Sequence, residues 1–353
     1  MVISLVLLFL TSISLSFYEE RLLLRDKVMV YVVLGITMIL IAGFREVGIV
    51  PDTEAYEAMF YAKSNSFSTK ITEPTFTFLS ETLHSWDFGI TALFLIYAII
   101  SIPLRLTAIW KLSSIPLFTL TVYISHYYQL HDVVQMRCAV ASALFLLALY
   151  YRLQQQKLYS LLCIVVGFFF HFSAIVGLLI FVINNKPLKN WQIAVLYSII
   201  PIGIVFSILG FDIAQFIPSE IGGTKLELYR EMKEKGIEGD LEGIPFYRDP
   251  AILSSICLFY GCLFFNRLLS EKNHYLPIFL KIMGIAFICK FTLANLSSVV
   301  ASRLFEYFDI VSIFLWTSAI YAFRPIEMGK TVIYLASTLI FLSGSLFYIL
   351  VKS

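Results

Sequence analysis

Apolar runs of roughly 18–22 residues recur along this chain, and they restrict its possible folds more than any other feature. A helix needs about 20 apolar residues to cross the hydrocarbon core of a bilayer. Of the 353 residues, 59% are hydrophobic and 14% are charged, whereas about a quarter of the residues in a soluble domain are charged. The sequence therefore predicts an all-α, polytopic integral membrane protein.

The basic residues of the short loops predict how the chain is oriented. The run 1–17 has no preceding basic region and no small-residue cleavage site, so we expect a first transmembrane helix rather than a signal peptide. The next loop, 18–27, contains two arginines and a lysine, which favour the cytoplasmic side. This places both termini outside the cytoplasm, together with two polar loops at about 44–87 and 210–250.

We expect a single transmembrane domain over residues 1–353, with roughly twelve membrane segments. The expected long helices cover 28–43, 88–108, 115–130, 133–151, 191–209, 251–269, 276–296, 304–322 and 331–350. Segment 74–84 is too short to span and is expected in the interface or as a re-entrant helix. Segment 224–235 is expected to form a surface helix.

Segment 158–183 is apolar, but both of its flanks are basic. A single crossing would place one basic flank outside, against the usual distribution of Lys and Arg. We therefore expect two short helices that form a membrane hairpin with His171 at its tip. Such a break in a membrane helix must be buried in protein or face a cavity.

The stretch 43–60, GFREVGIVPDTEAYEAMF, is unusually polar for a turn between membrane helices. It contains Arg45, Tyr56 and the carboxylates of Glu46, Asp52 and Glu54, with two glycines and a proline among them. We expect this stretch to form one wall of a site for a charged, sugar-like substrate at a membrane surface.

In this topology, polar residues gather at the outer ends of several helices. They are Arg45, Asp52, Tyr56, Glu73, His131, Asp132, Gln135, Arg137, Arg303, Glu306 and Tyr307. Such groups are costly to bury near lipid, so they are expected to face one another or a water-filled cavity. Converging arginines suggest recognition of a diphosphate, and a carboxylate or His131 can act as a general base on a sugar hydroxyl.

Structural roles compete with these functional ones. Asp52 can cap the helix expected to follow it, and Arg45 and Arg303 can extend to lipid headgroups. His171 can satisfy backbone groups that a helix break leaves open. Arg105 is expected in a cytoplasmic turn.

The sequence favours neither a metal nor a cofactor. It contains no DxD on an outer loop, no HExxH and no CxxC, and no P-loop, GxGxxG or GxSxG. The five cysteines fall in apolar segments and are expected to fill the core. A net charge of +2 does not favour nucleic acid as a partner.

Four motifs resemble the EpsG/Wzy-type polysaccharide polymerases of bacterial inner membranes. The first is the stretch 43–60 followed by TEPTF, and the others are QMRCAVASALFLLALYYR (135–152), FFFHFSAIVGLL (168–179) and ASRLFEYFD (301–309). The family places its aspartate almost directly after the glycine, whereas Ile49–Pro51 separate Gly48 from Asp52 here.

The resemblance implies an O-antigen or capsular polysaccharide polymerase, a GT-C-like glycosyltransferase with its active site facing the periplasm. Such enzymes transfer the growing glycan from undecaprenyl diphosphate to the non-reducing end of a new lipid-linked repeat, with inversion and without a metal ion. The expected partners are the lipid-linked donor and acceptor, the bilayer and a chain-length regulator.

The residues themselves fit this chemistry, which needs one base for the acceptor hydroxyl and positive charge for the departing diphosphate. His131, Asp52 and Glu306 compete for the role of general base. Substrate-binding roles are expected for Arg45, Arg137, Arg303, Tyr56, Glu73, Tyr307 and His171.

Two alternatives remain open. The first is an O-antigen ligase or another lipid-linked glycosyltransferase. The second is a flippase or exporter of lipid-linked oligosaccharide, for which broken helices, midplane charges and repeat symmetry are typical. Lys290 and Asp309 are the main indication of transport, although they can also form a structural ion pair.

Overall fold

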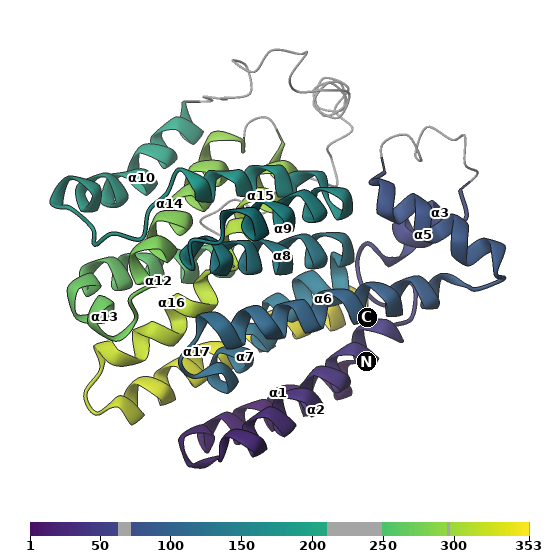
Figure 1. The fold of residues 1–353 in the computed structure, drawn as a ribbon, viewed down its shortest axis with the longest axis horizontal. Coiled ribbons are helices and arrows are strands. Elements are labelled where there is room, and N and C mark those ends of the chain that lie inside the picture. The colour runs from purple at the N-terminus through teal and green to yellow at the C-terminus, as the bar shows by residue number, and fades with distance from the viewer. Residues whose placement is uncertain (63–71, 210–248, 295–296, 353) are drawn as a thin grey trace. The chain divides into compact units, whose positions relative to one another are not determined.

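The computed structural model describes residues 1–62, 72–209, 249–294 and 297–352, and every regular element in these ranges is a helix (Figure 1). This confirms the all-α prediction. The surface helix expected at 224–235 lies outside the described residues. The chain divides into two compact units, Met1–Val182 with Phe323–Ser353 and Ile183–Ala322, which we call unit 1 and unit 2.

Unit 1 contains most of the long helices. Its α-helices are α1 Val2–Phe17, α2 Leu24–Gly43, α3 Thr53–Phe60, α5 Pro74–Ser85, α6 Ile90–Leu112, α7 Pro116–Ser125, α8 Met136–Leu153, α9 Lys157–Phe170 and α17 Ile326–Lys352. Three shorter elements join them, the 3₁₀ turns η1 Glu19–Arg21 and η3 Phe172–Phe181 and the π-helical turn η2 Tyr128–Val134.

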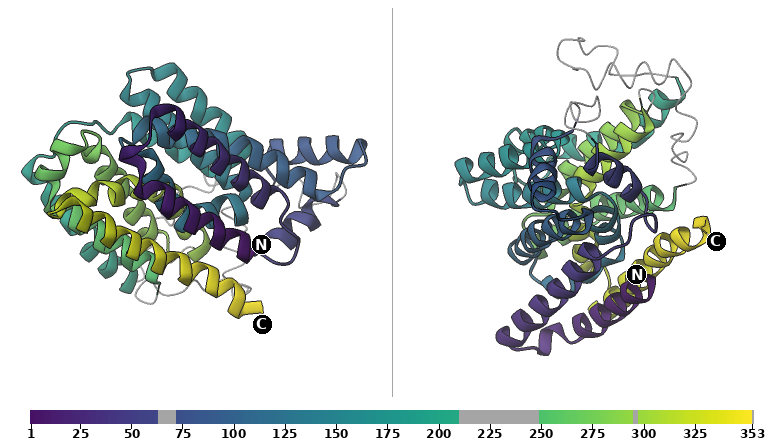
Figure 2. Two further views of the ribbon diagram at one scale, coloured as in Figure 1. Left: turned by 90° about the horizontal axis from the view of Figure 1, so that it is seen from below. Right: turned by 90° about the vertical axis from the view of Figure 1, so that its right-hand side faces the viewer.

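Helix α8 forms the centre of unit 1 and packs against both α6 and α9 (Figure 1). Its small residues allow this close packing. A Cβ atom added at Gly167 of α9 would be in van der Waals contact with the Cα atom of Ala141 in α8, at 3.7 Å. In the two views of Figure 2, α1 lies beside α17, and Phe9 stacks on Phe341 with ring centroids 4.3 Å apart.

The hairpin predicted for 158–183 is confirmed. His171 adopts an extended conformation between α9 and η3, which pack against each other. The guanidinium of Arg152, at the end of α8, lies 6.0 Å from the Phe181 ring, so η3 returns to the end of α8 where α9 begins. The two arms are about 21 Å and 20 Å long, shorter than a hydrocarbon core of about 30 Å.

Unit 2 is built from shorter helices. They are α10 Asn190–Ile208, α12 Pro250–Phe264, α13 Asn266–Lys272, α14 Leu276–Thr292, α15 Ser298–Asp309, α16 Ser312–Ala319 and the 3₁₀ turn η7 Ile320–Ala322. Helix α14 packs against α10 and α15. Gly203 and Gly284 allow the α10–α14 approach, since a Cβ atom at either would meet a neighbouring side chain within 2.8 Å.

Two helices that the sequence predicts as continuous are broken. The expected helix 251–269 bends by 85° between α12 and α13, and the Asn266 amide donates to the Leu263 carbonyl at the bend. The expected helix 304–322 is interrupted after Asp309. Among the described helices, five are long and apolar enough to span a membrane, or six if α12 and α13 form one span. Twelve segments therefore stay a prediction.

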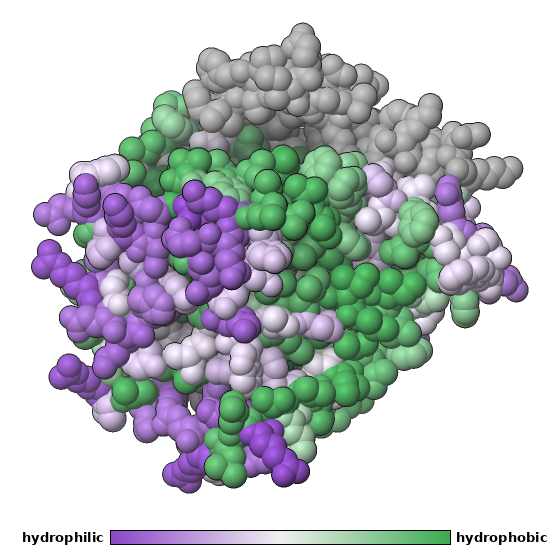
Figure 3. All heavy atoms as spheres, viewed as in Figure 1, coloured by the Kyte–Doolittle hydropathy of each residue, from purple (hydrophilic) through white to green (hydrophobic). Residues whose placement is uncertain are grey.

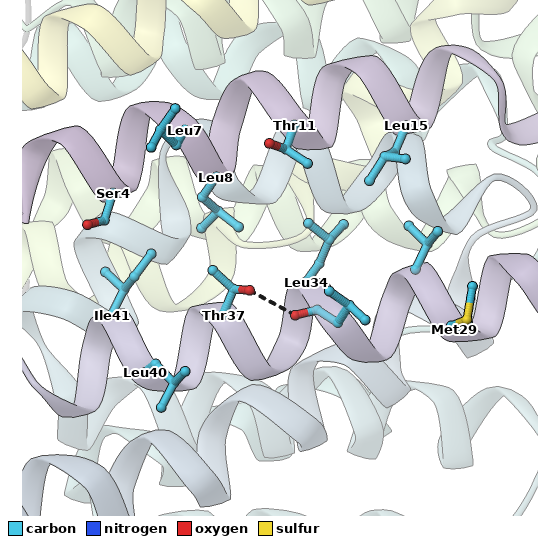
Figure 4. Close-up of a pocket in the computed structure, with 12 residues that line it drawn as sticks. Ser4, Leu7, Leu8, Thr11, Leu15, Met29, Leu34, Thr37, Leu40 and Ile41 are labelled. Carbon is cyan, nitrogen blue, oxygen red and sulfur yellow. Dashed lines mark hydrogen bonds between the residues drawn. The ribbon is translucent and has the colours of Figure 1, made fainter.

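The sides of α1 and α2 are apolar and exposed, as expected of helices that face lipid. Leu7, Met29 and Val33 are each more than half exposed. In Figure 3, hydrophobic residues cover these helices and hydrophilic residues gather where α1 joins α2. Between the two helices lies a groove of about 470 Å³ with a mainly aliphatic lining (Figure 4).

Glu19 holds the turn between α1 and α2 against another helix. Its buried carboxylate accepts hydrogen bonds from the backbone N–H groups of Leu117 and Phe118, at 3.0 and 2.9 Å, in the first turn of α7. These donors have no partner within their own helix. Burial raises the pKa of the Glu19 carboxyl, and the two backbone donors oppose that rise.

Replacing Glu19 with alanine is expected to lower the free energy of unfolding by about 1–3 kcal/mol, because two buried backbone donors lose their acceptor. Thermal unfolding of the purified protein in detergent measures the loss. Glu20→Ala is the matched control, since Glu20 is 65% exposed and pairs with Lys330 at the surface, where such a pair contributes about 0–1 kcal/mol. Equal shifts for the two variants would contradict the capping role.

Candidate functional site

A carboxylate, a guanidinium and an imidazole meet at the end of unit 1 where α8 begins. The Glu73 Oε2 atom pairs with Arg137 Nη1, and its Oε1 atom lies 3.0 Å from His171 Nδ1. Tyr56 of α3 packs beside them, with its ring centroid 5.3 Å from the Arg137 guanidinium carbon. We call Tyr56, Glu73, Arg137 and His171 the Glu73 cluster; all four are among the predicted site residues.

The backbone around Glu73 explains why its side chain points into this cluster. Glu73 is extended and immediately precedes Pro74, the first residue of α5. A residue before proline is disfavoured in the helical conformation, while proline is well suited to the first helical position. The Glu73 side chain therefore leaves the start of α5 and reaches the ends of α8 and α9.

Aromatic rings and one hydrogen bond hold the cluster in place. The Arg137 guanidinium also lies 5.5 Å from the Phe76 ring centroid, and stacking of a cation on aromatic rings is favourable in partly dry surroundings. Tyr97 of α6 is 1% exposed and contributes to the same core. The Thr75 hydroxyl donates to the Phe169 carbonyl at 2.7 Å, which connects α5 to the hairpin tip.

At the hairpin tip, backbone atoms satisfy much of the helix break. The His171 N–H donates to the Gly167 carbonyl at 2.8 Å, and the Ala174 N–H donates to the His171 carbonyl at 2.9 Å. The Nδ1 atom of the His171 ring instead faces Glu73. The His171 Nδ1 atom therefore does not bond to the backbone groups left open by the helix break, which was the alternative role for this side chain.

A second buried polar group lies between α6, α7, η2 and α8. It consists of Ser101, Arg105, Tyr123, His131, Asp132 and Ser142, which we call the Asp132 network. The Asp132 carboxylate accepts from the Ser101 hydroxyl at 2.6 Å and from the Tyr123 hydroxyl. Arg105 donates to the Ser142 hydroxyl at 2.6 Å.

Two residues of the Asp132 network, His131 and Arg105, lie in surroundings that the sequence did not predict. His131, one of the predicted bases, is fully buried with its Nδ1 atom 3.1 Å from the Ser142 hydroxyl. Arg105 was expected in a cytoplasmic turn, and this prediction is wrong. The residue lies inside α6 and is fully buried, with its guanidinium 5.3 Å from the Tyr123 ring.

Arg45 is folded into unit 1 instead of extending to headgroups, so that alternative is wrong for this residue. It is 3% exposed, and its guanidinium carbon lies 3.9 Å from the Phe94 ring centroid. It donates to the Ala42 carbonyl and, at 3.4 Å, to the Asp132 carbonyl. Burial lowers the pKa of Arg45 to about 10, so the group keeps its charge at neutral pH.

Asp52 stands at the predicted cap position of α3, but its side chain makes no capping hydrogen bond. Its backbone is left-handed, with φ at 65°. The Thr53 hydroxyl closes this loop instead, since it accepts from the Gly48 N–H at 3.0 Å and donates to the Val50 carbonyl at 2.6 Å. The capping alternative for Asp52 is therefore wrong.

The remaining predicted site residues belong to α15 in unit 2. Arg303, Glu306 and Tyr307 are three and four residues apart, so they share one face of this helix. The ion pair expected between Lys290 and Asp309 is wrong. Lys290 donates to Ser302 at 2.7 Å, and Asp309 accepts from Ser255 at 3.3 Å.

Sequence reasoning missed the role of Arg105, although a signal was present. An arginine inside an apolar run is expensive in a membrane and marks a buried partner or a functional site. Arg105 lies within the continuous run that forms α6, which argues against a turn. Ser101, Tyr123 and Ser142 carry no such signal, because isolated hydroxyl residues are common in apolar helices.

Comparison with protein-family models matches residues 28–353 to the EpsG family. No curated protein and no solved structure matches the chain. Among the described residues, no three His, Cys, Asp or Glu side chains are grouped so that they could hold a metal ion. The family match includes the Glu73 cluster, the Asp132 network and α15. The chain belongs to the EpsG family and, with its apolar helices, is a membrane protein of the polysaccharide-polymerase type.

Proposed function

We propose that this protein is a membrane glycosyltransferase that polymerises lipid-linked oligosaccharide. It transfers the growing glycan from undecaprenyl diphosphate to the non-reducing end of a new lipid-linked repeat. The observation that carries the proposal is the Glu73 cluster, in which three segments far apart in an EpsG-family sequence meet at one end of α8. A packed hydrophobic core alone does not require an arginine, a carboxylate and a histidine to meet there.

Arginine is suited to the leaving group of this reaction. When the anomeric carbon–oxygen bond breaks, negative charge develops on the diphosphate, and a fixed positive group stabilises it. The Arg137 guanidinium is 14% exposed and anchored on one side by Glu73. We assign Arg137, Arg45 and Arg303 to the diphosphate, in the role that a metal ion plays in other transferases. Inversion needs one base, for which His131, Asp52 and Glu306 were the predicted candidates.

The groove between α1 and α2 suits the polyprenyl chain of the donor (Figure 4). Leucine, valine, isoleucine and methionine dominate its lining, and no aromatic residue contributes. The groove ends at Ile41, one helical turn before Arg45. A linear apolar chain in this groove would therefore carry its diphosphate toward the end of α2 that leads to Arg45.

The finer topology belongs to the same proposal. We place the protein in the bacterial inner membrane with the Glu73 cluster facing the periplasm, because the basic loops favour the cytoplasm. We also propose that the chain forms one domain of roughly twelve membrane segments in a GT-C-like arrangement. Its proposed protein partner is a chain-length regulator. The described spans α2, α6, α8, α10 and α17 support a membrane location.

An elongation assay tests the proposed function. Purified protein in liposomes is mixed with lipid-linked repeat units alone, without nucleotide sugar or another energy source, and the products are separated by size. A ladder of repeat numbers is expected, because the donor diphosphate supplies the free energy of transfer. One transfer onto a different lipid acceptor would indicate a ligase, and movement of the substrate across the bilayer without a new bond would indicate a flippase. Either outcome would overturn the proposal.

A further inference from the structure

We propose that His171 is the general base that removes the proton from the acceptor hydroxyl, and that Glu73 positions it. The inference rests on the proposed function and names the base for it. It starts from the contact between the Glu73 carboxylate and the His171 imidazole, 3.0 Å apart at the hairpin tip.

The partner of His171 decides which ring nitrogen is basic. Glu73 lies against the Arg137 guanidinium, which favours the ionised carboxylate. An ionised carboxylate only accepts hydrogen bonds, so the neutral imidazole must carry its hydrogen on Nδ1. The lone pair is then on Nε2, and that atom is the proton acceptor.

Two other groups that could accept a proton, Glu73 and His131, are less exposed than His171. Both Glu73 oxygens are engaged, one by Arg137 and one by His171, and its side chain is only 1% exposed. The His171 side chain is 10% exposed and lies at a break between two short helices. His131 is fully buried inside the Asp132 network. Among these three groups, His171 has the most exposed side chain, although its Nε2 atom is itself buried, so the acceptor hydroxyl must enter the cluster to reach it.

The transfer step balances with these groups. The acceptor oxygen forms a bond to the anomeric carbon of the donor glycan, and His171 Nε2 takes the hydroxyl proton. The bond from that carbon to the diphosphate oxygen breaks, and its electron pair stays on the diphosphate beside Arg137. Glu73 stabilises the imidazolium that forms, as a carboxylate does for a histidine base in hydrolases. The imidazolium afterwards releases its proton to water.

The matched variant for this proposal is His171→Asn. The asparagine amide keeps a hydrogen-bond donor close to the position of Nδ1, so the contact with Glu73 is preserved, but Nε2 is lost. The initial rate of elongation is expected to fall by about 10²–10⁴-fold. The apparent KM for the acceptor and the retention of lipid-linked donor on immobilised protein are expected to stay close to those of the wild type.

The pH profile separates a base from a structural histidine. The charged and titratable groups around His171 are Glu73 before α5, Arg137 of α8 and His131 of η2, with Tyr56 of α3 and Tyr97 of α6 in the same core. In the wild type the rate should fall at acidic pH as the imidazole becomes protonated, and this fall should be absent in His171→Asn. Glu73→Gln removes a negative charge that favours the imidazolium, so the acidic fall should move to lower pH.

The control is Thr75→Val, which removes the other connection between α5 and the hairpin tip without touching His171. If His171 only held the tip in place, Thr75→Val and His171→Asn would lower the rate alike and leave the same pH profile. That result, or a His171→Asn rate within about threefold of the wild type, would overturn the base assignment while the wild-type ladder still supports the function. A wild type without a ladder would overturn both.

Discussion

Replacing Arg137 with alanine is expected to abolish long-chain glycan while the protein still inserts into the membrane. The guanidinium lies beside the Tyr56 and Phe76 rings and pairs with Glu73, so its charge is fixed before the substrate arrives. Loss of one fixed group that stabilises developing charge lowers a rate by about 10²–10³-fold, which is enough to reduce a ladder to single repeats. Gel separation of lipid-linked glycan from matched amounts of membrane protein measures the effect.

Two further variants separate this loss from damage to the fold. In Arg137→Ala, Glu73 keeps a buried charge without its guanidinium, which is itself costly. The double variant with Glu73→Gln removes that charge, and it should recover stability but not polymer. Arg152→Ala changes the arginine at the opposite end of α8 and should keep the ladder. A normal ladder from Arg137→Ala would contradict the proposed role.

The Glu73 cluster shows how far the sequence leads. Arg137 opens a helix of small residues, His171 interrupts an apolar run and Glu73 precedes a proline, so each was recognisable as unusual. The hairpin followed from two basic flanks that need the same side of the membrane. The contacts of Glu73 with Arg137 and His171 could not be predicted, because the rotation of α8 and α9 about their axes depends on the packing between these helices.

Broken helices were harder to predict. Segments 251–269 and 304–322 are apolar throughout most of their length, and hydrophobic periodicity alone does not distinguish a straight span from a bent one. At the bend after Phe264, the Asn266 side-chain amide donates to the Leu263 carbonyl, a local contact that the hydrophobic pattern does not encode. The capping role considered for Asp52 was wrong for a similar reason. A residue type that suits the cap position does not fix the backbone conformation that capping requires.

The Asp132 network and the Glu73 cluster are connected through the chain itself. The π-helical turn η2 contains Asp132 and ends at Val134, and Arg137 follows three residues later in the first turn of α8. Such turns are rare, and they often occur at functional sites. Asp132 accepts hydrogen bonds from α6 and α7, so it holds η2 in place and thereby sets where α8 begins. This role explains why a charged residue is buried here.

Replacing Arg105 with methionine is therefore expected to destabilise the protein strongly, although Arg105 lies outside the Glu73 cluster. Arg105 and Asp132 interact electrostatically and are bridged by Tyr123, whose ring lies under the guanidinium and whose hydroxyl donates to the carboxylate. Removing one member of a buried charge pair costs about 3–5 kcal/mol, because the other charge is left without compensation. The unfolding temperature in detergent measures the loss.

The double variant Arg105→Met with Asp132→Asn decides whether charge balance is the cause. Asparagine keeps a carbonyl acceptor for Ser101 or Tyr123 but carries no charge, so the double variant should be more stable than Arg105→Met alone. Lys111→Met is the matched control, since Lys111 is exposed in the last turn of the same helix. An equal loss in the single and double variants would mean that Arg105 acts only through its hydrogen bonds to α8. Recovery in the double variant would show that α6 and η2 are held together by opposite charges, on which the position of Arg137 depends.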